Sequence, residues 1–274
     1  MMSGLLSGLL SGRTTRFAHA AAFSALVSLF GPAGAPAAQA DDIVLAAAAS
    51  MIDPIAELIE RFERETGHTV RLSLGSSGSF VAQISNGAPF DVFLAADMNY
   101  PRRLEQAGLI EPGSLQVYGT GRIVLWVRQD SPVDLGRLGM EALLDPAVRR
   151  IAIANPRLAP YGTAAVEAME GAGIYDQVSP RIVRGENVAQ AAQFVAAGAA
   201  DIGVIALSQA AAPRMPAGRY WEVPADLHAP IEQGVAILAR ARQSGRYQAA
   251  RQFVDMLMGP LGRSILGKYG FAVP

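Results

Sequence analysis

Residues 43–79 read IVLAAAASMIDPIAELIERFERETGHTVRLSLGSSGS, and this stretch decides the fold class. The apolar run 43–49 predicts a buried strand, and residues 53–65 place their apolar side chains on one face of a helix. Residues 69–74 alternate apolar and polar side chains, which indicates a second strand. The glycines and serines at 75–79 then form a turn. The stretch is therefore one strand–helix–strand unit.

The same order of strand, turn and helix continues to the end of the chain. Further strands are predicted at residues 91–95, 122–127, 151–154, 181–183, 202–205 and 235–238. Helices are predicted at residues 79–86, 101–107, 135–144, 163–170, 189–197, 247–258 and 261–268. Alternation of this kind predicts an α/β fold in which mostly parallel sheets are flanked by helices.

Two segments are predicted to divide the chain into two lobes. They are the Gly-rich turn at 119–121 and the polar stretch at 230–234. Because the chain crosses twice, lobe I is discontinuous and consists of residues 41–119 plus 234–274, while lobe II consists of residues 120–233. A cleft between two lobes is the natural place for a ligand.

Residues 1–40 have the organisation of a cleavable signal peptide. Arg13 and Arg16 precede an apolar stretch at 17–30, and small residues follow up to Ala40. The apolar stretch is shorter than the roughly 20 residues that span a bilayer. Cleavage is expected near Ala40-Asp41, which predicts a periplasmic protein.

Composition excludes several classes of protein. The sequence has no cysteine, so neither a disulfide nor a lipid attached to cysteine is available. Without residues 1–40, which hold two arginines and no acidic residue, 21 basic residues face 24 acidic ones, a net charge of −3. A slightly acidic chain lacks the electrostatic footprint of a nucleic-acid-binding protein. An anion site in this chain must therefore use local dipoles.

Four segments place small or hydroxyl-bearing residues at a predicted strand-to-helix turn. In α/β sheets such turns lie at the carboxyl ends of strands, where ligands bind. Each following helix offers unpaired N–H groups and the positive end of its dipole, which together bind anions without a cationic side chain. A single serine there is more often a helix cap, so the combination carries the argument. The segments are AASM at 48–51, GSSGS at 75–79, APYG at 159–162 and GENV at 185–188.

At these segments the chain resembles the periplasmic molybdate-binding proteins of ABC transporters, which have the type II solute-binding fold. The resemblance covers nearly all of the chain after residue 40, and NGAPFDVFLAAD and ANPRLAPYG are its most specific parts. It is carried by AAAASM at 46–51, GSSGSFVAQ at 75–83, NGAPFDVFLAAD at 86–97, IAIANPRLAPYG at 151–162, ENVAQAA at 186–192, ADIGVIA at 200–206 and KYGF at 268–271.

The resemblance implies a set of neutral donors to the oxyanion. Ser50 and Ser77 would donate through hydroxyl and backbone N–H, and Tyr161 and Val188 through backbone N–H. Some family members have a tyrosine donor where this chain has an alanine at position 206, so the N–H of Met51 is a replacement for that contact. No protein atom would ligate molybdenum directly, because the metal is held as its oxyanion. No cofactor is expected.

The donor set explains why molybdate is the expected ligand. Molybdate is a proton-free dianion near neutral pH, whereas phosphate keeps a proton that would stay unpaired in a site without an acceptor, at a cost of about 1–3 kcal/mol. No Asp or Glu is therefore expected around the ligand, and tungstate should bind comparably. The family's role implies delivery of the oxyanion to an ABC-type membrane permease, by a protein that is expected to be a monomer.

Two alternatives stay open at this point. Sulfate or thiosulfate is also proton-free, and only the size of the site separates it from molybdate. A secreted serine hydrolase is the enzymatic alternative, although Ser79 stands where the last glycine of a G-x-S-x-G elbow should be. His68 and His228 lack metal-ligand spacing. A protein without enzymatic activity is the prediction.

Overall fold

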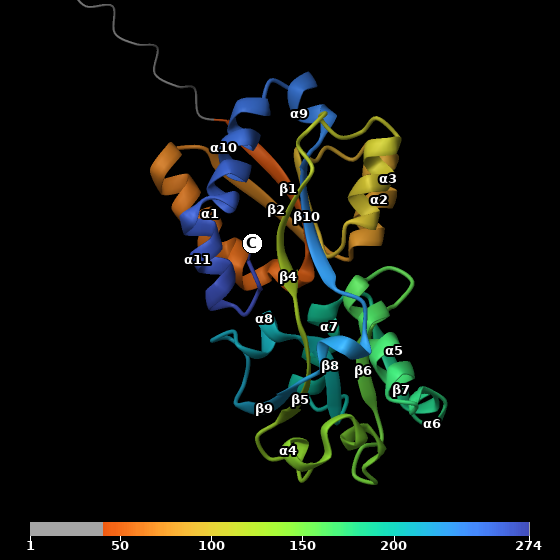
Figure 1. The fold of residues 1–274 in the computed structure, drawn as a ribbon. Coiled ribbons are helices and arrows are strands. Elements are labelled where there is room, and N and C mark those ends of the chain that lie inside the picture. Colours follow the sequence, from red (N-terminus) through yellow and green to blue (C-terminus); the bar gives the residue numbers. More distant parts are fainter. Residues whose placement is uncertain (1–40, 274) are drawn as a thin grey trace, which may run out of the picture. The chain divides into compact units, whose positions relative to one another are not determined.

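The computed structural model describes residues 41–273, which form two five-stranded sheets with helices packed against them (Figure 1). The predicted signal peptide, residues 1–40, lies outside the described residues. The α/β fold class predicted from the sequence is confirmed.

The first sheet has the strand order β2-β1-β3-β10-β4. Its strands are β1 (Asp42–Ala48), β2 (Thr69–Gly75), β3 (Val92–Ala95), β4 (Gln116–Gly121) and β10 (Ile231–Ile237). The associated helices are η1 (Ala49–Met51), α1 (Ile52–Thr66), α2 (Ser77–Ser85), α3 (Asn99–Gln106), α9 (Ala239–Gln243), α10 (Tyr247–Met258) and α11 (Pro260–Lys268). This first lobe thus combines both ends of the described chain.

The second sheet has the strand order β7-β6-β8-β5-β9. Its strands are β5 (Ile123–Arg128), β6 (Ile151–Ala154), β7 (Ile182–Gly185), β8 (Ile202–Ala206) and β9 (Gly218–Glu222). Its helices are α4 (Leu135–Leu138), η2 (Gly139–Leu144), α5 (Pro160–Gly171), α6 (Tyr175–Val178), η3 (Ser179–Arg181), α7 (Val188–Ala196), α8 (Leu207–Ala210) and η4 (Ala225–Leu227). All of this second lobe comes from the middle of the chain.

Both sheets are mixed, and in each of them four of the five strands run in the same direction, which agrees with the prediction of mostly parallel sheets. β1 pairs in parallel with β2 and β3, but β10 is antiparallel to β3 and β4. In the second sheet β6 is parallel to β7 and β8, and β5 is antiparallel to β8 and β9. The parallel pairs belong to strands that are joined in sequence by helices, as in βαβ units: β1, β2 and β3 in the first sheet, and β6, β7 and β8 in the second. The strands that run the other way are β5 and β10, each of which is the first strand that the chain forms in its sheet after a crossing between the lobes.

The core of the first lobe has two parts, one on each face of its sheet. Alternation along β1 divides the side chains between them: Ile43 and Leu45 lie on the side of α1, α10 and α11, and Ala46 lies on the side of α2 and α3. Figure 1 shows these two groups of helices on opposite faces of the sheet. Phe62 and Phe253 meet edge to face on the first side, with ring centroids 5.2 Å apart.

Three local predictions are corrected by the structure. Residues 119–121, expected as a turn, are the end of β4, and residues 230–234 lie largely in β10, so the chain crosses between the lobes along strands. The expected helix at 135–144 is broken at Gly139, whose φ is +55°. Leu74, expected on the alternating buried face, is 37% exposed, because β2 lies at the edge of the sheet.

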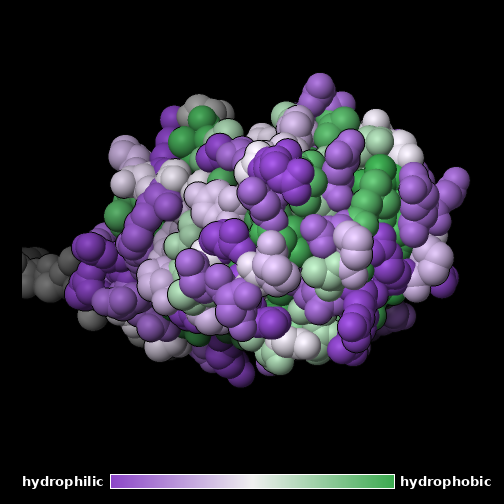
Figure 2. Space-filling view, turned by 90° about the horizontal axis from the view of Figure 1, so that it is seen from below, coloured by the Kyte–Doolittle hydropathy of each residue, from purple (hydrophilic) through white to green (hydrophobic). Residues whose placement is uncertain are grey.

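The molecular surface is mixed in character. Figure 2 shows hydrophilic side chains interspersed with smaller groups of hydrophobic ones on the end viewed from below. Within the part of the chain that the structure describes, no helix is long and apolar enough to cross a membrane.

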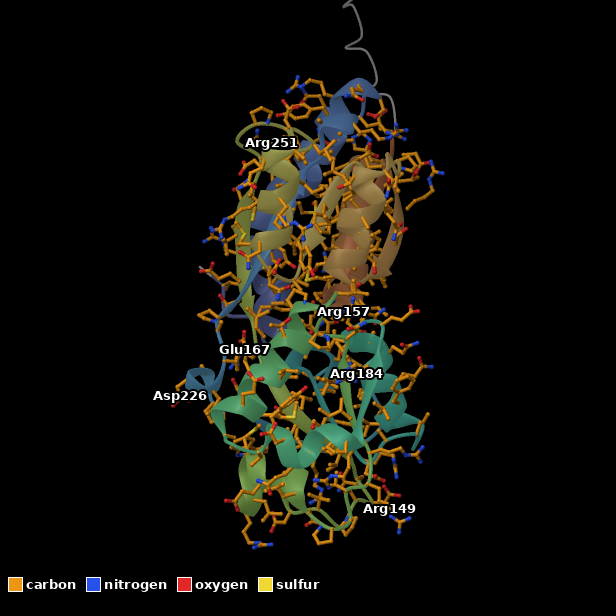
Figure 3. The ribbon with its side chains drawn as sticks, turned by 90° about the vertical axis from the view of Figure 1, so that its right-hand side faces the viewer. Arg149, Arg157, Glu167, Arg184, Asp226 and Arg251 are labelled. Atoms are coloured by element: carbon orange, nitrogen blue, oxygen red, sulfur yellow. The ribbon has the colours of Figure 1, made fainter. Side chains whose placement is uncertain are left out.

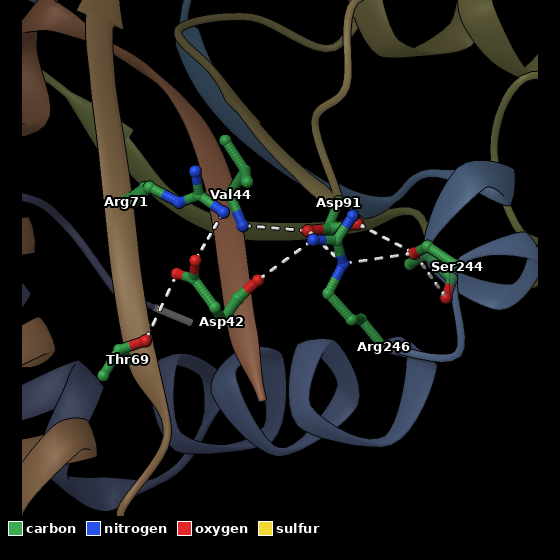
Figure 4. A network of polar contacts seen from close by, with 8 residues as sticks. Asp42, Val44, Thr69, Arg71, Asp91, Ser244 and Arg246 are labelled. Atoms are coloured by element: carbon green, nitrogen blue, oxygen red, sulfur yellow. Dashed lines mark hydrogen bonds and ion pairs between the residues drawn. The ribbon is translucent and has the colours of Figure 1, made fainter. Parts of the chain in front are cut away.

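A buried ion pair links the start of β1 to the segment between α9 and α10 (Figure 4). Asp91 is fully buried, and its Oδ2 accepts the N–H of Val44 at 2.8 Å and lies 3.3 Å from Nε of Arg246. Arg246 also donates to the carbonyl of Asp42 at 3.2 Å, and Ser244 donates to Asp91 at 3.5 Å. The carboxylate thus holds the C-terminal part of the chain against the first strand.

We expect Asp91→Ala to lower the free energy of unfolding by about 3 kcal/mol, because removing one partner leaves a partly buried guanidinium without its counter-ion. Asp255→Ala is the matched control: its pair with Arg251 is about half exposed, and such pairs contribute at most about 1 kcal/mol. Urea unfolding of both variants measures the difference. Equal losses would show that the Asp91 network does not stabilise the lobe.

Candidate functional site

Four helix N-termini meet at one small cavity. The N-cap residues of η1, α2, α5 and α7 all line it, two from each lobe: Ala48, Ser76, Ala159 and Asn187. The cavity has a volume of about 10 Å³, the room of roughly one water molecule. Pockets for drug-sized ligands have volumes of roughly 300–1,000 Å³, so this cavity has room only for a very small ligand.

Some of the first-turn amides at this cavity are already paired. The hydroxyl of Ser76 accepts the N–H of Ser79 at 3.4 Å, and the amide oxygen of Asn187 accepts the N–H of Gln190 at 3.1 Å. The cap of α2 is Ser76, because the helix begins at Ser77, two residues before the predicted start at residue 79. These caps pair the third amide of each helix and leave the first one free.

The remaining amides are those of the predicted donors. Ser77 is the first residue of α2 and Val188 the first residue of α7, so neither N–H has an acceptor within its own helix. In α5 the first residue is Pro160, which has no N–H, and Tyr161 carries the first amide. The predicted start of this helix at residue 163 is three residues late. The structure therefore places Tyr161 in the first turn.

Two buried serines add hydroxyl groups. Ser77 is fully buried, and its Oγ accepts the N–H of Ala96 at 2.9 Å, so its own hydroxyl hydrogen stays available. Ser50 is 1% exposed, and its Oγ has no hydrogen-bond partner among the described residues. An unpaired buried hydroxyl costs stability in the absence of a partner. Such a group at a cavity indicates a polar ligand.

The cavity is electrically neutral in its side chains. None of the described residues that line it is acidic, basic or a histidine. The arginines labelled on the second lobe in Figure 3, among them Arg157 and Arg184, have exposed side chains. Within residues 41–273 no cluster of three or more His, Asp or Glu side chains could hold a metal ion. An anion bound here would meet only dipoles.

Contacts between the lobes lie close to the cavity. Ser208 of α8 donates to the carbonyl of Ser50 at 2.8 Å, and Gln209 donates to the carbonyl of Ala49 at 3.2 Å. The N–H of Gly78 donates to the carbonyl of Leu158 at 2.9 Å. Arg214 and Asp53 form an ion pair at 2.6 Å between the second lobe and the first turn of α1. The two lobes are therefore held together around the cavity.

The phenol of Tyr161 points away from its own amide and toward the crossing strands. The phenol oxygen accepts a hydrogen bond from Nε2 of Gln233 on β10 at 3.3 Å. The hydroxyl of Tyr118 on β4 donates a hydrogen bond to Oε1 of the same glutamine at 3.0 Å. Burial raises the pKa of the Tyr161 phenol, and the neighbouring Ser50 hydroxyl and Gln233 amide oppose that rise. Burial also raises the pKa of Tyr118. Both phenols therefore stay neutral over the physiological range.

The structure brings together four of the five residues that the sequence singled out. Ser50, Ser77, Tyr161 and Val188 line the same cavity. Met51 does not: its side chain is fully buried in the core on the α1 side of the first sheet.

Sequence reasoning missed the residues that support the site from a distance. Asn187 carried a recognisable signal, because an asparagine before a helix is a common cap. Gln233 and Tyr118 carried none, because 115 residues separate them in the chain and only the paired strands β4 and β10 bring them together. The same holds for Ser208, which is 158 residues from its acceptor.

Comparison with known proteins finds relatives that are solute-binding proteins. Residues 43–272 match the model of a family described as bacterial extracellular solute-binding proteins. The molybdate-binding protein ModA of Azotobacter vinelandii is 40% identical over 239 residues, which cover 86% of this chain and 92% of that protein. The molybdate-binding protein ModA of Rhodobacter capsulatus is 38% identical over 234 residues, 85% of this chain and 89% of the relative.

Solved structures share the fold. The periplasmic molybdate-binding protein of Azotobacter vinelandii superimposes with a TM-score of 0.77 at 35% identity, over 85% of this chain and 99% of that one. The sulfate-binding protein SubI of Mycobacterium tuberculosis superimposes with a TM-score of 0.70 at 17% identity, over 84% of this chain and 86% of that one, which shows the shared fold alone. The chain thus belongs to the bacterial extracellular solute-binding protein family and has its two-lobed α/β fold.

Proposed function

We propose that this protein captures molybdate in the cavity between its lobes and delivers it to an ABC-type permease. The observation that carries the proposal is the donor set: four helix N-termini and two buried serine hydroxyls surround a cavity without a charged side chain. The relatives named for molybdate binding, at 38–40% identity over most of the chain, support the same ligand. Ser50, Ser77, Tyr161 and Val188 are the proposed donors.

The chemistry of the cavity favours an oxyanion without a proton. Molybdate and tungstate near neutral pH only accept hydrogen bonds, and the cavity offers N–H and O–H groups. Hydrogen phosphate would need an acceptor for its proton, and no carboxylate lines the cavity. An unpaired proton on a bound ligand costs about 1–3 kcal/mol. Sulfate meets the same donor requirement, so its smaller size is the property that separates it from molybdate.

The position of Met51 makes the fifth contact a separate proposal. Its side chain does not reach the cavity, but its N–H lies one residue after Ser50 in the turn η1. Ala206, at the end of β8, is fully buried and does not line the cavity. We therefore propose the N–H of Met51 as the extra donor.

Binding is proposed to proceed by closure of the two lobes. Each lobe supplies two helix N-termini, so neither lobe alone surrounds an anion. The proposed hinge lies at the two crossings, near residues 120 and 233. The boundaries between the lobes that are predicted from the sequence lie at the same positions. Closure about such crossings is a common hinge motion in periplasmic binding proteins. The proposed setting is the periplasm after removal of residues 1–40, with a monomer that has no enzymatic activity.

Isothermal titration calorimetry should rank the ligands in the order molybdate and tungstate, then sulfate, then phosphate. Sulfate should bind more weakly than molybdate because of the size of the cavity. Phosphate should bind more weakly than sulfate because its proton would stay unpaired. Sulfate or phosphate binding more tightly than molybdate would refute the proposed ligand.

Ser77→Ala should weaken molybdate binding by about 1–3 kcal/mol, because it removes a hydroxyl donor to a charged ligand and the acceptor for the N–H of Ala96. Ser79→Ala is the matched control, since Ser79 belongs to the same helix but does not line the cavity. Calorimetry on both variants gives the difference. Equal affinity in Ser77→Ala and wild type would remove Ser77 from the site.

Affinity for molybdate should stay constant between about pH 6.5 and pH 9. Among residues 41–273, the only titratable side chain that lines the cavity is Tyr161. Burial raises its pKa, so the neutral form persists at higher pH than for an exposed tyrosine, whose pKa is about 10. Titrations across this range measure the effect. A fall in affinity centred between pH 6.5 and pH 9 would reveal a titrating group in contact with the ligand.

A further inference from the structure

A short segment of the second lobe holds one turn of the first lobe from behind the cavity. The segment is α8, and its Ser208 and Gln209 are 3% and 1% exposed. The hydroxyl of Ser208 donates to the carbonyl of Ser50 at 2.8 Å, and Nε2 of Gln209 donates to the carbonyl of Ala49 at 3.2 Å. Ala49 and Ser50 line the cavity, whereas Ser208 and Gln209 do not. The two side chains therefore contact the turn η1 on the side that faces away from the cavity.

The carbonyl of Ser50 is open to such a donor because of the sequence that follows it. In an α-helix this carbonyl would accept the N–H of the residue four positions later. That residue is Pro54, in the first turn of α1, and proline has no N–H. The hydroxyl of Ser208 from the other lobe supplies a donor in its place. The proline of the first lobe and the serine of the second lobe are therefore complementary.

The carbonyl of Ala49 differs, because it already accepts the N–H of Ile52 at the end of η1. A carbonyl oxygen has two lone pairs, so it can accept the amide of Gln209 as well. The other end of that amide, Oε1 of Gln209, is buried and has no hydrogen-bond partner among the described residues. A buried polar atom without a partner costs stability. The stability of the fold therefore does not explain the Gln209 contact, and a role in the neighbouring site does.

Each contacted carbonyl belongs to a peptide unit whose other end is an N–H group. A trans peptide is planar, and its C=O and N–H bonds point in opposite directions. The carbonyl of Ala49 shares its peptide unit with the N–H of Ser50, and the carbonyl of Ser50 shares its unit with the N–H of Met51. These are two of the amides that the proposed function assigns to the anion. With their carbonyls held by α8, both N–H groups point away from α8.

The two hydrogen bonds also polarise these peptide units. A donor at the carbonyl makes the N–H at the other end of the same unit a stronger donor, and hydrogen bonds in series strengthen one another in a buried site. Such polarisation matters most where only neutral dipoles hold the ligand. No charged side chain of residues 41–273 lines this cavity. Donors behind η1 therefore strengthen the kind of interaction on which the site depends.

We propose that Ser208 and Gln209 are positioning residues of the oxyanion site, which act through the peptide units of η1. Gln209 orients and polarises the N–H of Ser50, and Ser208 does the same for the N–H of Met51. This inference rests on the proposed oxyanion function and adds two residues that do not touch the ligand. Because both come from the second lobe, the first lobe presents these amides fully only when the lobes meet.

The test uses Gln209→Met and Ser208→Ala, with Ser208→Thr and Arg214→Gln as matched controls. Methionine keeps the length of the glutamine side chain without its amide, and alanine removes the serine hydroxyl, which threonine restores. Arg214 follows α8 and pairs with Asp53 of α1 at 2.6 Å. Its replacement weakens contact between the same two parts of the lobes without touching the carbonyls of η1.

Calorimetry should show that Gln209→Met and Ser208→Ala each bind molybdate about three- to tenfold more weakly, the change expected for one hydrogen bond. Ser208→Thr should stay within about twofold of wild type, because it keeps the hydroxyl. Urea unfolding without molybdate should give equal stabilities for Gln209→Met and wild type. The Ala49 carbonyl keeps its bond from Ile52, and the unpaired Oε1 is removed.

Amide proton shifts in isotope-labelled protein separate positioning from a simple contact between the lobes. In wild type, saturating molybdate should move four amide protons downfield, because hydrogen bonds to an anion deshield them. The four belong to Ser50, Met51, Ser77 and Val188. Gln209→Met should reduce the change at Ser50 alone, and Ser208→Ala should reduce the change at Met51 alone. Arg214→Gln should leave all four changes as in wild type, since the ligand is saturating.

Three results would overturn the inference. They are an unchanged affinity in both test variants, a full shift of the Ser50 amide in Gln209→Met, and an equal reduction at Ser50, Ser77 and Val188, which would indicate incomplete closure. If circular dichroism shows that one variant does not fold, the other carries the test. Failure of the proposed function is distinguishable, because wild-type protein would then bind no molybdate and none of the four amide protons would move.

Discussion

The first amides of several helices face one cavity, which no charged side chain of residues 41–273 lines, and the arrangement of the two lobes around it depends on this constraint. Such amides have no acceptor within their helices, and burying them without a partner costs free energy. An anion satisfies them together and also interacts favourably with the positive ends of the helix dipoles. The cavity therefore attracts an anion although the chain as a whole is slightly acidic.

The division of these amides between two lobes links binding to conformation. η1 and α2 follow strands of the first sheet, and α5 and α7 follow strands of the second. Because each lobe carries half of the proposed donors, an anion bound in the cavity would contact both lobes, as the hydrogen bonds between the lobes already do. The strands β4 and β10 pair in the first sheet, and Gln233 on β10 donates a hydrogen bond to the phenol of Tyr161, which lines the cavity.

Much of the fold was accessible from local patterns. Alternation along β1 and the apolar face of α1 are visible in the sequence, because they follow from the periods of strands and helices. The four segments of the site were also visible, since Ser50, Ser77, Tyr161 and Val188 each follow a predicted strand. The errors include the starts of α2 and α5, which begin two and three residues early, and β4, whose glycines indicated a turn. They also include the break of the expected helix at Gly139 and β9, which the sequence analysis did not predict.

The sequence by itself determined the type of most long elements and pointed to four residues that line the uncharged cavity, because these features depend on neighbours within a few positions. Only the tertiary structure decided which side chains direct those residues. Gln233 meets Tyr118 and Tyr161, and Ser208 meets Ser50, across separations of 72 to 158 residues. Contacts at such separations depend on strand pairing and on how the lobes meet, and no local pattern encodes either one.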